Sequence, residues 1–551
     1  MVKEEKLLEN ENIDFNNEVS YIKENLINWY PFSTNSEILE ITTNDEIKLT
    51  EYLKSKSYNV IRLIAEKEML SRSDIGKFNY VIIHNIDVIN KSEISLEQIL
   101  EFAKEHQKEN GTILISIKNS LGVENLNCSS SNQEQSNEEK NMYLKNDVLN
   151  LINQIFENYH YKFYYPLPNE DYPNVIFTDK HLPSQEGILR DMTLYKPHTV
   201  IKDDEREIFR KLLKEDKNLF GIFANTFLVE ISLEPIKTDI EYVSFGNSRK
   251  PEYRLKTVMT DSQVYKKPIS KKAEVHISEI KENIEILEKS NIYMLDKYEN
   301  GQIYSKLIKQ EISFDKFLIN EANKNGMNSI IDWIKKFKDE LDIKLEKSEN
   351  NNLTVFEKYG LKCNSDLKNK MHFIKHGIFD LIFQNCFVID NKFYFYDQEW
   401  REENIPLEFI IYRAIYYLGN SNKLIDTDML YKSLNLTNFI EIFNKLEFIL
   451  QEKIKDDEIW DIHREGYMTV KATYATMVHF RNLHAELKKD YNELEEEKEN
   501  REKELDNEIK EKEKLIVDLE KKIKAMENSR SWRITKPLRY FNGKFNNKAG
   551  R

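Results

Sequence analysis

HGIFDLIFQNCFVIDNKFYFYDQEW, residues 376–400, organises the second half of the chain. It places a carboxylate, Asp380, five positions before a carboxamide, Asn385. A short apolar run, an Asp-Asn turn and a second strand-like run then lead to Asp397. This pattern predicts a β-hairpin, which would bring Asn385 and Asp397 together although twelve positions separate them.

These three residue types suit phosphoryl transfer from a nucleotide. In that chemistry one Asp accepts the proton of the incoming hydroxyl, and an Asn and a second Asp hold the metal ions that bridge the phosphates. We therefore expect Asp380 to act as the base, and Asn385 and Asp397 to hold Mg²⁺ beside ATP. The alternative is an ordinary surface hairpin whose Asp and Asn residues only form turns.

The composition is that of a globular protein with several domains. The 551 residues leave room for about three or four domains, and 40% of them are hydrophobic. The net charge of −14 excludes a general nucleic-acid-binding protein. The charge is uneven, because residues 529–551 carry seven Arg or Lys and no acid. This end is therefore expected to contact something anionic.

Several features favour a cytoplasmic protein. The start, MVKEEKLLENEN, is acidic and polar and does not resemble a signal peptide. The most apolar helical run, residues 409–418, is too short to span a membrane. It carries Arg413, which we expect in a structural ion pair, because a buried Arg needs an anionic partner. Three cysteines lie far apart, without zinc-site spacing, as in a reducing compartment: Cys128, Cys363 and Cys386.

The N-terminal part alternates strand-like and helix-like runs between residues 36 and 165, as parallel α/β folds do. A polar, flexible insertion interrupts it at residues 126–141. We expect a Rossmann-type α/β domain over residues 1–195. Its expected strands are residues 37–41, 59–64, 79–84, 111–117 and 161–165, and its expected helices are residues 47–54, 96–106 and 146–157.

This layout resembles a class I methyltransferase, the kind that uses S-adenosylmethionine (SAM). The best-matching stretches are ILISIKNSLG, residues 113–122, and YYPLPNEDYPNVIFTDKHLP, residues 164–183. Both resemble methyltransferase-like domains of bacterial surface-polysaccharide gene clusters. The resemblance implies that SAM binds at the turn after the first strand.

The sequence departs from that pattern at the cofactor turn. The turn should be rich in Gly, because only Gly lets the backbone close on the cofactor without a Cβ clash. The second strand should end in an acid that binds the ribose hydroxyls, but Ile64 occupies this position and Glu66 is the nearest acid. We therefore expect a methyltransferase fold that no longer methylates. The turn itself consists of Thr42, Thr43, Asn44 and Asp45.

Residues 196–239 are expected to bridge to a kinase-like domain over residues 240–478. GIFANTFLVEI, residues 221–231, reads as a strand of this bridge, with Asn225 as a structural hydrogen-bonding residue. The kinase-like part lacks a GxGxxG loop, and residues 245–248 are the only candidate for a loop that covers the phosphates.

A hairpin, a strand Lys and then a helix form the small lobe of kinases, where the Lys grips the α- and β-phosphates and pairs with a helix Glu. We expect Lys266 in this role, with Lys267 as the alternative, because strand alternation points only one of them inward. The expected strands are residues 253–259 and 263–267, followed by a helix at residues 271–289. The helix partner of the Lys stays open among Glu274, Glu279 and Glu282.

Asp380, Asn385 and Asp397 together resemble the kinase-like fold of aminoglycoside and sugar phosphotransferases. The order of methyltransferase, kinase and coiled coil resembles the bifunctional O-antigen chain terminators, which phosphorylate and then methylate the end of a growing polysaccharide. The resemblance implies an envelope-polysaccharide protein that transfers phosphate from ATP to a hydroxyl of a polysaccharide or lipid-linked glycan. One departure is that Ile378 and Phe379 displace Asp380 by two positions from the usual His-Gly-Asp.

Residues 479–528 are expected to form a coiled coil. From residue 485 to residue 526 the chain is nearly all Glu, Lys and Leu or Ile, without Gly or Pro. We expect a homodimer or trimer, and a single solvated helix is the alternative. The expected a and d positions are Leu505, Ile509, Ile516, Leu519, Ile523 and Met526, with Lys512 as a polar break.

The tail, residues 529–551, interleaves Trp532 and other apolar residues with basic ones. This pattern suits an interfacial anchor on anionic lipid at the inner face of the cell membrane. SWRITKPLR resembles the ends of many bacterial glycosyltransferases and their partners, and docking onto another protein is the alternative.

Two other functions stay open. In the first, both catalytic domains are inactive, and the coiled coil and tail tether a glycosyltransferase complex at the membrane. In the second, the N-terminal domain is an active SAM-dependent methyltransferase acting on a glycan or glycan phosphate.

Overall fold

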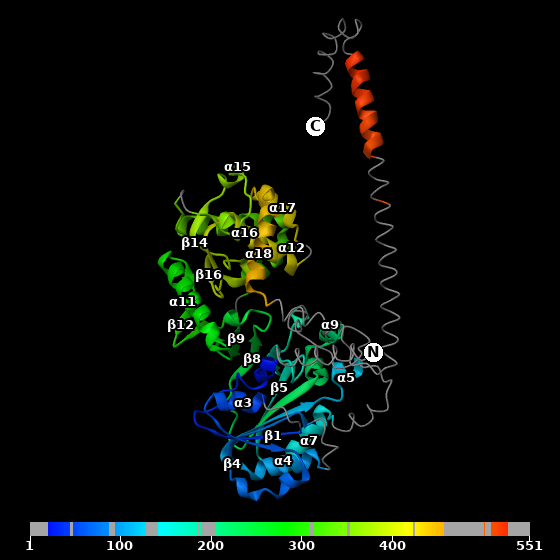
Figure 1. The fold of residues 1–551 in the computed structure, drawn as a ribbon, viewed down its shortest axis with the longest axis vertical. Helices are drawn as coiled ribbons and strands as arrows, with labels where there is room; N and C mark the ends of the chain where they lie inside the picture. The colour runs from blue at the N-terminus through cyan, green and yellow to red at the C-terminus, as the bar shows by residue number, and fades with distance from the viewer. Residues whose placement is uncertain are drawn as a thin grey trace, which may run out of the picture. The chain divides into compact units, whose positions relative to one another are not determined.

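The computed structural model divides the chain into two compact units, Met1–Val470 and Lys471–Arg551, which are drawn as a ribbon in Figure 1. It describes residues 20–43, 48–86, 94–127, 142–185, 187–188, 205–308, 312–349, 353–422, 425–456, 501 and 509–526.

Six strands of the N-terminal part lie in the order β2-β1-β3-β4-β7-β5. The first four are parallel, and β7 runs antiparallel between β4 and β5. This arrangement is a Rossmann-like sheet, so the predicted α/β fold is confirmed for this part of the chain. The strands are β1 (Glu37–Thr42), β2 (Asn59–Ile64), β3 (Phe78–His84), β4 (Gln107–Lys118), β5 (His160–Leu167) and β7 (Thr226–Ser232).

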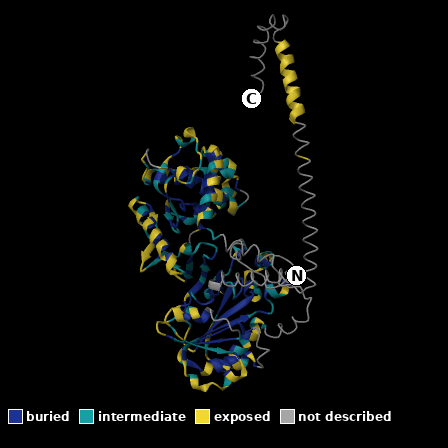
Figure 2. Ribbon diagram, viewed as in Figure 1, coloured by how far each residue is buried: buried dark blue, intermediate teal, exposed yellow. Residues whose placement is uncertain are grey.

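Continuous apolar runs explain why these segments form central strands. Leu39, Ile83 and Ile113, from β1, β3 and β4, are fully buried, and a parallel strand covered on both faces needs such a run. Figure 2 shows these strands in the dark blue of buried residues. The helices of this part are α2 (Ser20–Lys23), α3 (Lys48–Ser55), α4 (Leu96–Glu105), α5 (Val123–Asn127), α7 (Lys145–Ile155) and α9 (Glu205–Glu215).

The segment expected to bridge two domains belongs to the sheet. GIFANTFLVEI begins with the short helix α10 (Phe220–Phe223) and continues as β7, which pairs with both β4 and β5. It therefore does not connect two domains, because it supplies the reversed strand of the first one. Asn225 is structural, since its side chain donates to the carbonyl of Pro168 at 2.9 Å and accepts the Glu124 N–H at 2.8 Å.

The same sheet continues beyond the Rossmann-like strands. β6 (Val175–Thr178) pairs with β5 on one side and with β8 (Ile240–Phe245) on the other. Antiparallel strands follow in the order β8-β9-β10-β13-β12, so one 12-stranded sheet runs through the described residues. Apolar residues of α11 (Glu274–Lys289) pack on its far end. The further strands are β9 (Leu255–Thr260), β10 (Gln263–Pro268), β12 (Asp296–Glu299) and β13 (Gln302–Lys306).

A mainly helical part with short strands completes the first unit. Aromatic rings fill its centre, where Phe314 and Phe337 contact Phe383 and Phe393. Its strands are β11 (Tyr293–Met294), β14 (Phe373–Ile378), β15 (Cys386–Ile389), β16 (Lys392–Phe395) and β17 (Arg401–Pro406). Its helices are α12 (Phe314–Asn325), α13 (Met327–Lys344), α14 (Val355–Lys358), α15 (Ser365–Lys368), α16 (Leu407–Ser421), α17 (Thr427–Ser433) and α18 (Ile440–Ile454).

In the second unit, residues 509–526 are helical. The side chains of Ile509, Ile516 and Ile523 at expected a and d positions are 52%, 55% and 54% exposed. The coiled coil stays a prediction, and the tail from residue 529 lies outside the described residues. None of the described helices is long and apolar enough to cross a membrane.

Candidate functional site

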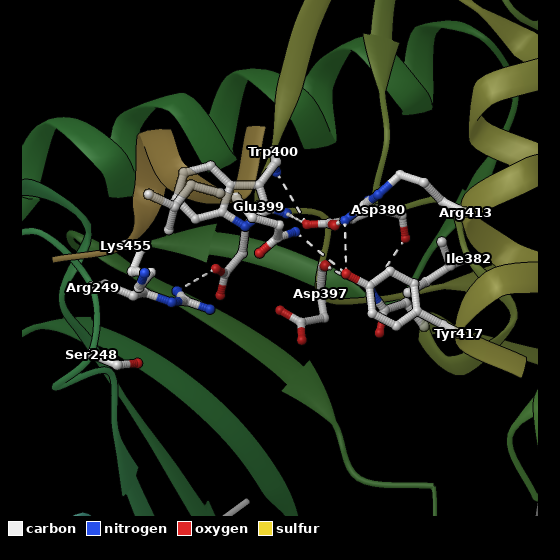
Figure 3. A pocket seen from close by; sticks show the side chains of 13 residues that line it. Ser248, Arg249, Asp380, Ile382, Asp397, Glu399, Trp400, Arg413, Tyr417 and Lys455 are labelled. Carbon is white, nitrogen blue, oxygen red and sulfur yellow. Dashed lines mark hydrogen bonds and ion pairs between the residues drawn. The ribbon is translucent and has the colours of Figure 1, made fainter. Parts of the chain in front are cut away.

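A cavity of about 350 Å³ lies where the loop after β8 meets the helical part. Figure 3 shows its side chains, which come from the loop after β8, the segments after β14 and β16, and the helices α16 and α18. Three of the residues expected to act in phosphoryl transfer line it. The full lining is Ser248, Arg249, Asp380, Ile382, Asn385, Asp397, Glu399, Trp400, Arg413, Tyr417, Gln451, Ile454 and Lys455.

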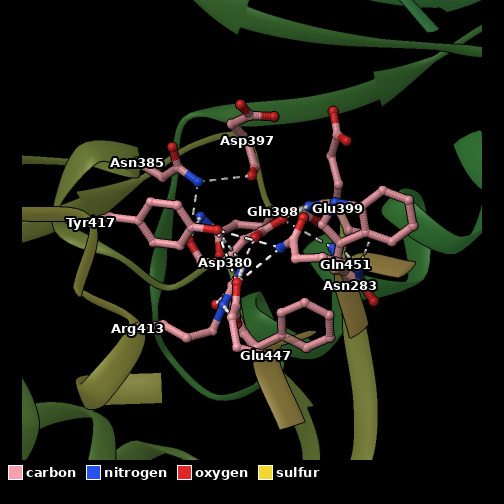
Figure 4. A network of polar contacts seen from close by, with 12 residues as sticks. Asn283, Asp380, Asn385, Asp397, Gln398, Glu399, Arg413, Tyr417, Glu447 and Gln451 are labelled. Carbon is pink, nitrogen blue, oxygen red and sulfur yellow. Dashed lines mark hydrogen bonds and ion pairs between the residues drawn. The ribbon is translucent and has the colours of Figure 1, made fainter. Parts of the chain in front are cut away.

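The predicted hairpin joins Asn385 to Asp397. β15 and β16 are antiparallel, and Asp390 and Asn391 between them have left-handed backbones with φ of 49° and 61°. The Asn385 side chain, just before β15, donates to the carbonyls of Asp397 at 3.3 Å and Asp380 at 3.2 Å. One carboxamide thus contacts the backbone of both Asp380 and Asp397, and Figure 4 shows the three residues.

Asp397 has an unusual backbone that aims its carboxylate outward. Its φ of 60° is left-handed, a region that Asp enters more readily than most residues. Its N–H donates to the buried carboxylate of Asp296 on β12 at 2.7 Å. The Asp397 side chain remains 39% exposed and lines the cavity, so its carboxylate could contact a metal ion there.

Lys266 on β10 does not line the cavity itself, but it contacts two of the lining residues. Its ammonium group contacts the carboxylates of Asp397 and Glu399. Burial alone would lower the pKa of Lys266, but these two carboxylates outweigh it, and the pKa lies above its usual value. Lys267 lies on the opposite face of the strand, where its Nζ is 4.7 Å from the centroid of the Tyr265 ring. Strand alternation therefore leaves Lys266 as the inward lysine.

The partner of Lys266 is not the helix Glu that we expected. Glu279 contacts His276 at 3.2 Å, Glu282 contacts Arg401 at 3.0 Å, and Glu274 is exposed. Glu399 takes this role from the segment that carries Asp397. The sequence signal was an acid two positions after Asp397, but nothing local indicated which cation it would meet.

α11 acts on this segment through a different pair of side chains. Asn283 donates to the carbonyls of Gln398 and Glu399, both at 3.1 Å. The buried ring of His276 stacks on Trp400, with ring centroids 4.5 Å apart, and its Nε2 lies 3.8 Å from Glu399. The helix therefore holds the Glu399 backbone and its neighbouring ring.

Asp380 is buried and held by three donors. Its Oδ2 accepts the N–H groups of Glu399 and Trp400, each at 3.2 Å, and its Oδ1 accepts from Arg413 at 3.2 Å. A carboxylate has about four acceptor sites, so one remains for an incoming hydroxyl. Burial raises the pKa of Asp380 to about 6, although Arg413 opposes this shift. Asp380 is thus ionised at neutral pH and can accept a proton.

Arg413 forms the structural ion pair expected from the sequence. Its Nε donates to Glu447 at 2.6 Å, and its Nη1 bonds both Asp380 and the carbonyl of Phe379. The guanidinium therefore connects α16 and α18 to Asp380. Figure 4 shows this network around Asp380.

The described residues contain no group of three or more His, Cys, Asp or Glu side chains that could hold a metal ion by themselves. Mg²⁺ at nucleotide sites usually takes only one or two protein ligands, with phosphates and waters completing its octahedron. Asn385 and Asp397 could supply such a partial set, since both line the cavity.

The expected SAM turn is described only in part. Thr42 ends β1 as a buried residue, and the Thr43 hydroxyl donates to the carbonyl of Asn85. Asn44 and Asp45 lie outside the described residues. Two residues before Thr42 on the same strand, the buried carboxylate of Glu40 accepts a hydrogen bond from the Thr50 hydroxyl at 2.5 Å and lies 2.9 Å from His84 Nε2. This end of the sheet therefore carries polar groups without the Gly turn.

No known protein family matches the sequence, and no curated protein matches it either.

Several solved methyltransferase structures are similar to the N-terminal part. One is a SAM-dependent methyltransferase of Thermotoga maritima, a possible histamine N-methyltransferase, with 10% identity, a TM-score of 0.24, and coverage of 41% of this chain and 96% of that one. Another, from Archaeoglobus fulgidus, has 10% identity, a TM-score of 0.25, and coverage of 40% and 98%. The plantazolicin methyltransferase BpumL in complex with SAH has 11% identity, a TM-score of 0.23, and coverage of 40% and 88%. These values say nothing of activity.

Proposed function

We propose that this protein transfers a phosphoryl group from ATP to a hydroxyl acceptor in the cavity beside Asp397. One observation carries the proposal: Lys266, Asn385 and Asp397 come from three separate elements and converge where Asp380 offers a buried base. A lysine, an amide and two carboxylates are the groups that this chemistry uses.

Each residue has a role that its surroundings support. Lys266 would bind the phosphates, leaving Asp397 for the metal ion. Asn385 and Asp397 would orient Mg²⁺, which when bound neutralises the negative charge that gathers on the phosphates. Asp380 would take the proton of the acceptor hydroxyl on its remaining acceptor site.

The acceptor follows from the sequence resemblance alone. We propose a hydroxyl of a polysaccharide or lipid-linked glycan, with a glycosyltransferase complex as the partner. The expected coiled coil and basic tail would place such an enzyme beside its polymer at the membrane surface.

Calorimetric titration of the full chain with Mg-ATP tests the site. Lys266→Met and Asp397→Asn should each abolish binding, because they remove the phosphate anchor and a metal ligand. Lys267→Met is the matched control, since its ammonium group lies over Tyr265 on the face of the strand opposite to Lys266. The assignment is wrong if Asp397→Asn binds and turns over ATP as the wild type does.

Methyl transfer is the second proposal. It is supported by the strand order β2-β1-β3-β4-β7-β5 and by the buried Glu40, which lies two residues before the end of β1. Titration with SAM in a separate experiment tests it. A protein that binds neither SAM nor Mg-ATP would instead support the proposed non-catalytic scaffold for a glycosyltransferase complex.

A further inference from the structure

The loop between β8 and β9 reaches over the cavity. Its residues Ser248 and Arg249 line the cavity opposite Asp380 and Asn385, as Figure 3 shows for Arg249 and Asp380. This loop contains the one sequence that we considered for covering the phosphates, and it has no Gly-rich pattern. Without several Gly residues, its backbone N–H groups are not arranged as in a Gly-rich loop that covers the phosphates. A side chain of this loop would then have to contact the phosphates instead.

The guanidinium of Arg249 is placed from two sides. Its Nη1 donates to Glu399 at 2.6 Å, and its plane lies over the Trp400 ring at 5.6 Å. Among the described residues, this is the one hydrogen bond from its side chain. A guanidinium has five N–H donors in a rigid fork, so others remain for an anion in the cavity. The side chain is 31% exposed.

The loop that presents Arg249 is itself held at several points. Asn247 is buried and donates to Asn174 at 2.7 Å, and it accepts from Asn25 at 2.9 Å. Beyond Arg249, the Lys250 N–H donates to the carbonyl of Ile454 at 2.9 Å. These anchors lie on opposite sides of the loop, so Arg249 projects from a preorganised backbone.

Glu399 forms ion pairs with two cations at this side of the cavity, Lys266 and Arg249. It accepts from Lys266 and from Arg249, so both ammonium and guanidinium groups are held near Asp397 before any phosphate arrives. A planar guanidinium suits bidentate contact with a phosphate. Lys266 and Arg249 thus form a cationic pair on one carboxylate.

We propose that Arg249 is a phosphate-binding residue of the nucleotide site and contacts the terminal phosphate of ATP in place of a Gly-rich loop. The inference rests on the proposed phosphoryl transfer and names a further ligand of that same site.

The test compares three ligands on the full chain by calorimetry: Mg-ATP, Mg-ADP and adenosine. Arg249→Gln should weaken Mg-ATP binding by about tenfold or more, because it removes a charge-assisted contact. Mg-ADP binding should weaken less, and adenosine binding should not change. Lys250→Gln is the matched control, because its ammonium group donates to the carbonyls of Glu452 and Lys453 outside the cavity, and all three affinities should stay as in the wild type.

Several outcomes overturn the inference. An unchanged Mg-ATP affinity in Arg249→Gln would do so, and so would an equal loss for all three ligands, which marks a merely structural role. If Arg249→Gln does not fold, Arg249→Lys replaces it, because lysine keeps a cation beside Glu399 but lacks the planar set of guanidinium N–H donors. The inference then requires the same order of losses, with Mg-ATP binding weakened most and adenosine binding unchanged. A wild type that does not bind Mg-ATP overturns both this inference and the proposed function. Binding that is lost in Lys266→Met but intact in Arg249→Gln overturns this inference alone.

Discussion

Replacing Glu399 by Gln removes the carboxylate that Lys266 and Arg249 share. Lys266 keeps Asp397 after this change, whereas Arg249 loses its ion pair at 2.6 Å. Breaking a buried pair by removing one partner destabilises a protein by about 3–5 kcal/mol. Because the Arg249 side chain is 31% exposed, solvent screens part of this loss, and we expect about 2–3 kcal/mol.

Thermal unfolding followed by calorimetry measures this loss. Such a change lowers the Tm of a domain of about 150–250 residues by roughly 4–12 °C; because the compact unit that contains Glu399 is larger, we expect a fall at pH 7 toward the lower end of this range. The control is Glu282→Gln, whose 59% exposed carboxylate pairs with Arg401 on the surface and should contribute less than about 1 kcal/mol. If the Tm of Glu399→Gln equals that of Glu282→Gln, our assignment of Glu399 as the shared counter-ion is refuted.

The pH dependence gives a second readout. Burial alone would raise the pKa of Glu399, but Arg249 and Lys266 hold it well below its usual value. A depressed carboxyl pKa stabilises the fold above the ordinary Glu pKa of about 4.3, and this stabilisation is lost as the pH falls toward the lower folded value. The gap in Tm between wild type and Glu399→Gln should therefore narrow below about pH 4. A gap that is constant from pH 7 to pH 3.5 would contradict the shared ion pair.

Three further predictions concern the base and the C-terminal unit. Asp380→Asn should lower kcat by at least about 100-fold while Mg-ATP still binds. Because the pKa of Asp380 is about 6 and only the ionised form accepts a proton, the kcat of the wild type should fall below pH 6. A kcat that does not change with pH would exclude Asp380 as the base. Ile516→Asp should place a charge in the apolar seam and shift the chain to monomer in light scattering, whereas a monomeric wild type would disprove the coiled coil. Deleting residues 529–551 should abolish binding to anionic vesicles at low salt and leave the oligomer size unchanged, because each basic residue contributes about 1 kcal/mol; binding that survives the deletion would disprove the anchor.

Local patterns predicted the elements of the site better than its contacts. The Asp-Asn turn after Ile389 predicted the hairpin that joins Asn385 to Asp397, and strand alternation singled out the two lysines of which Lys266 points inward. Both inferences depend on residues close in sequence. Glu399 could not be assigned in this way, because Lys266 and Arg249 lie more than a hundred positions earlier in the chain.

The sheet shows the same limit at a larger scale. The small and apolar residues of 221–231 predict an extended strand, and β7 confirms it. Its place between β4 and β5 depends on tertiary pairing, which the pattern of apolar residues does not encode. Arg249 was overlooked for a similar reason, since it lies in an irregular loop without a motif.

The pairing of β6 with β8 limits how the Rossmann-like part and the part after it can be studied separately. A recombinant fragment that starts at residue 240 would lose the partners of Val243 and Ser244, which are Ile176 and Val175. The bared strand would present unpaired N–H and C=O groups, and such an edge recruits other chains into aggregates. A fragment that starts at residue 240 and precipitates would thus report a cut sheet, and tests of the proposed activity require a chain that retains both halves of the sheet.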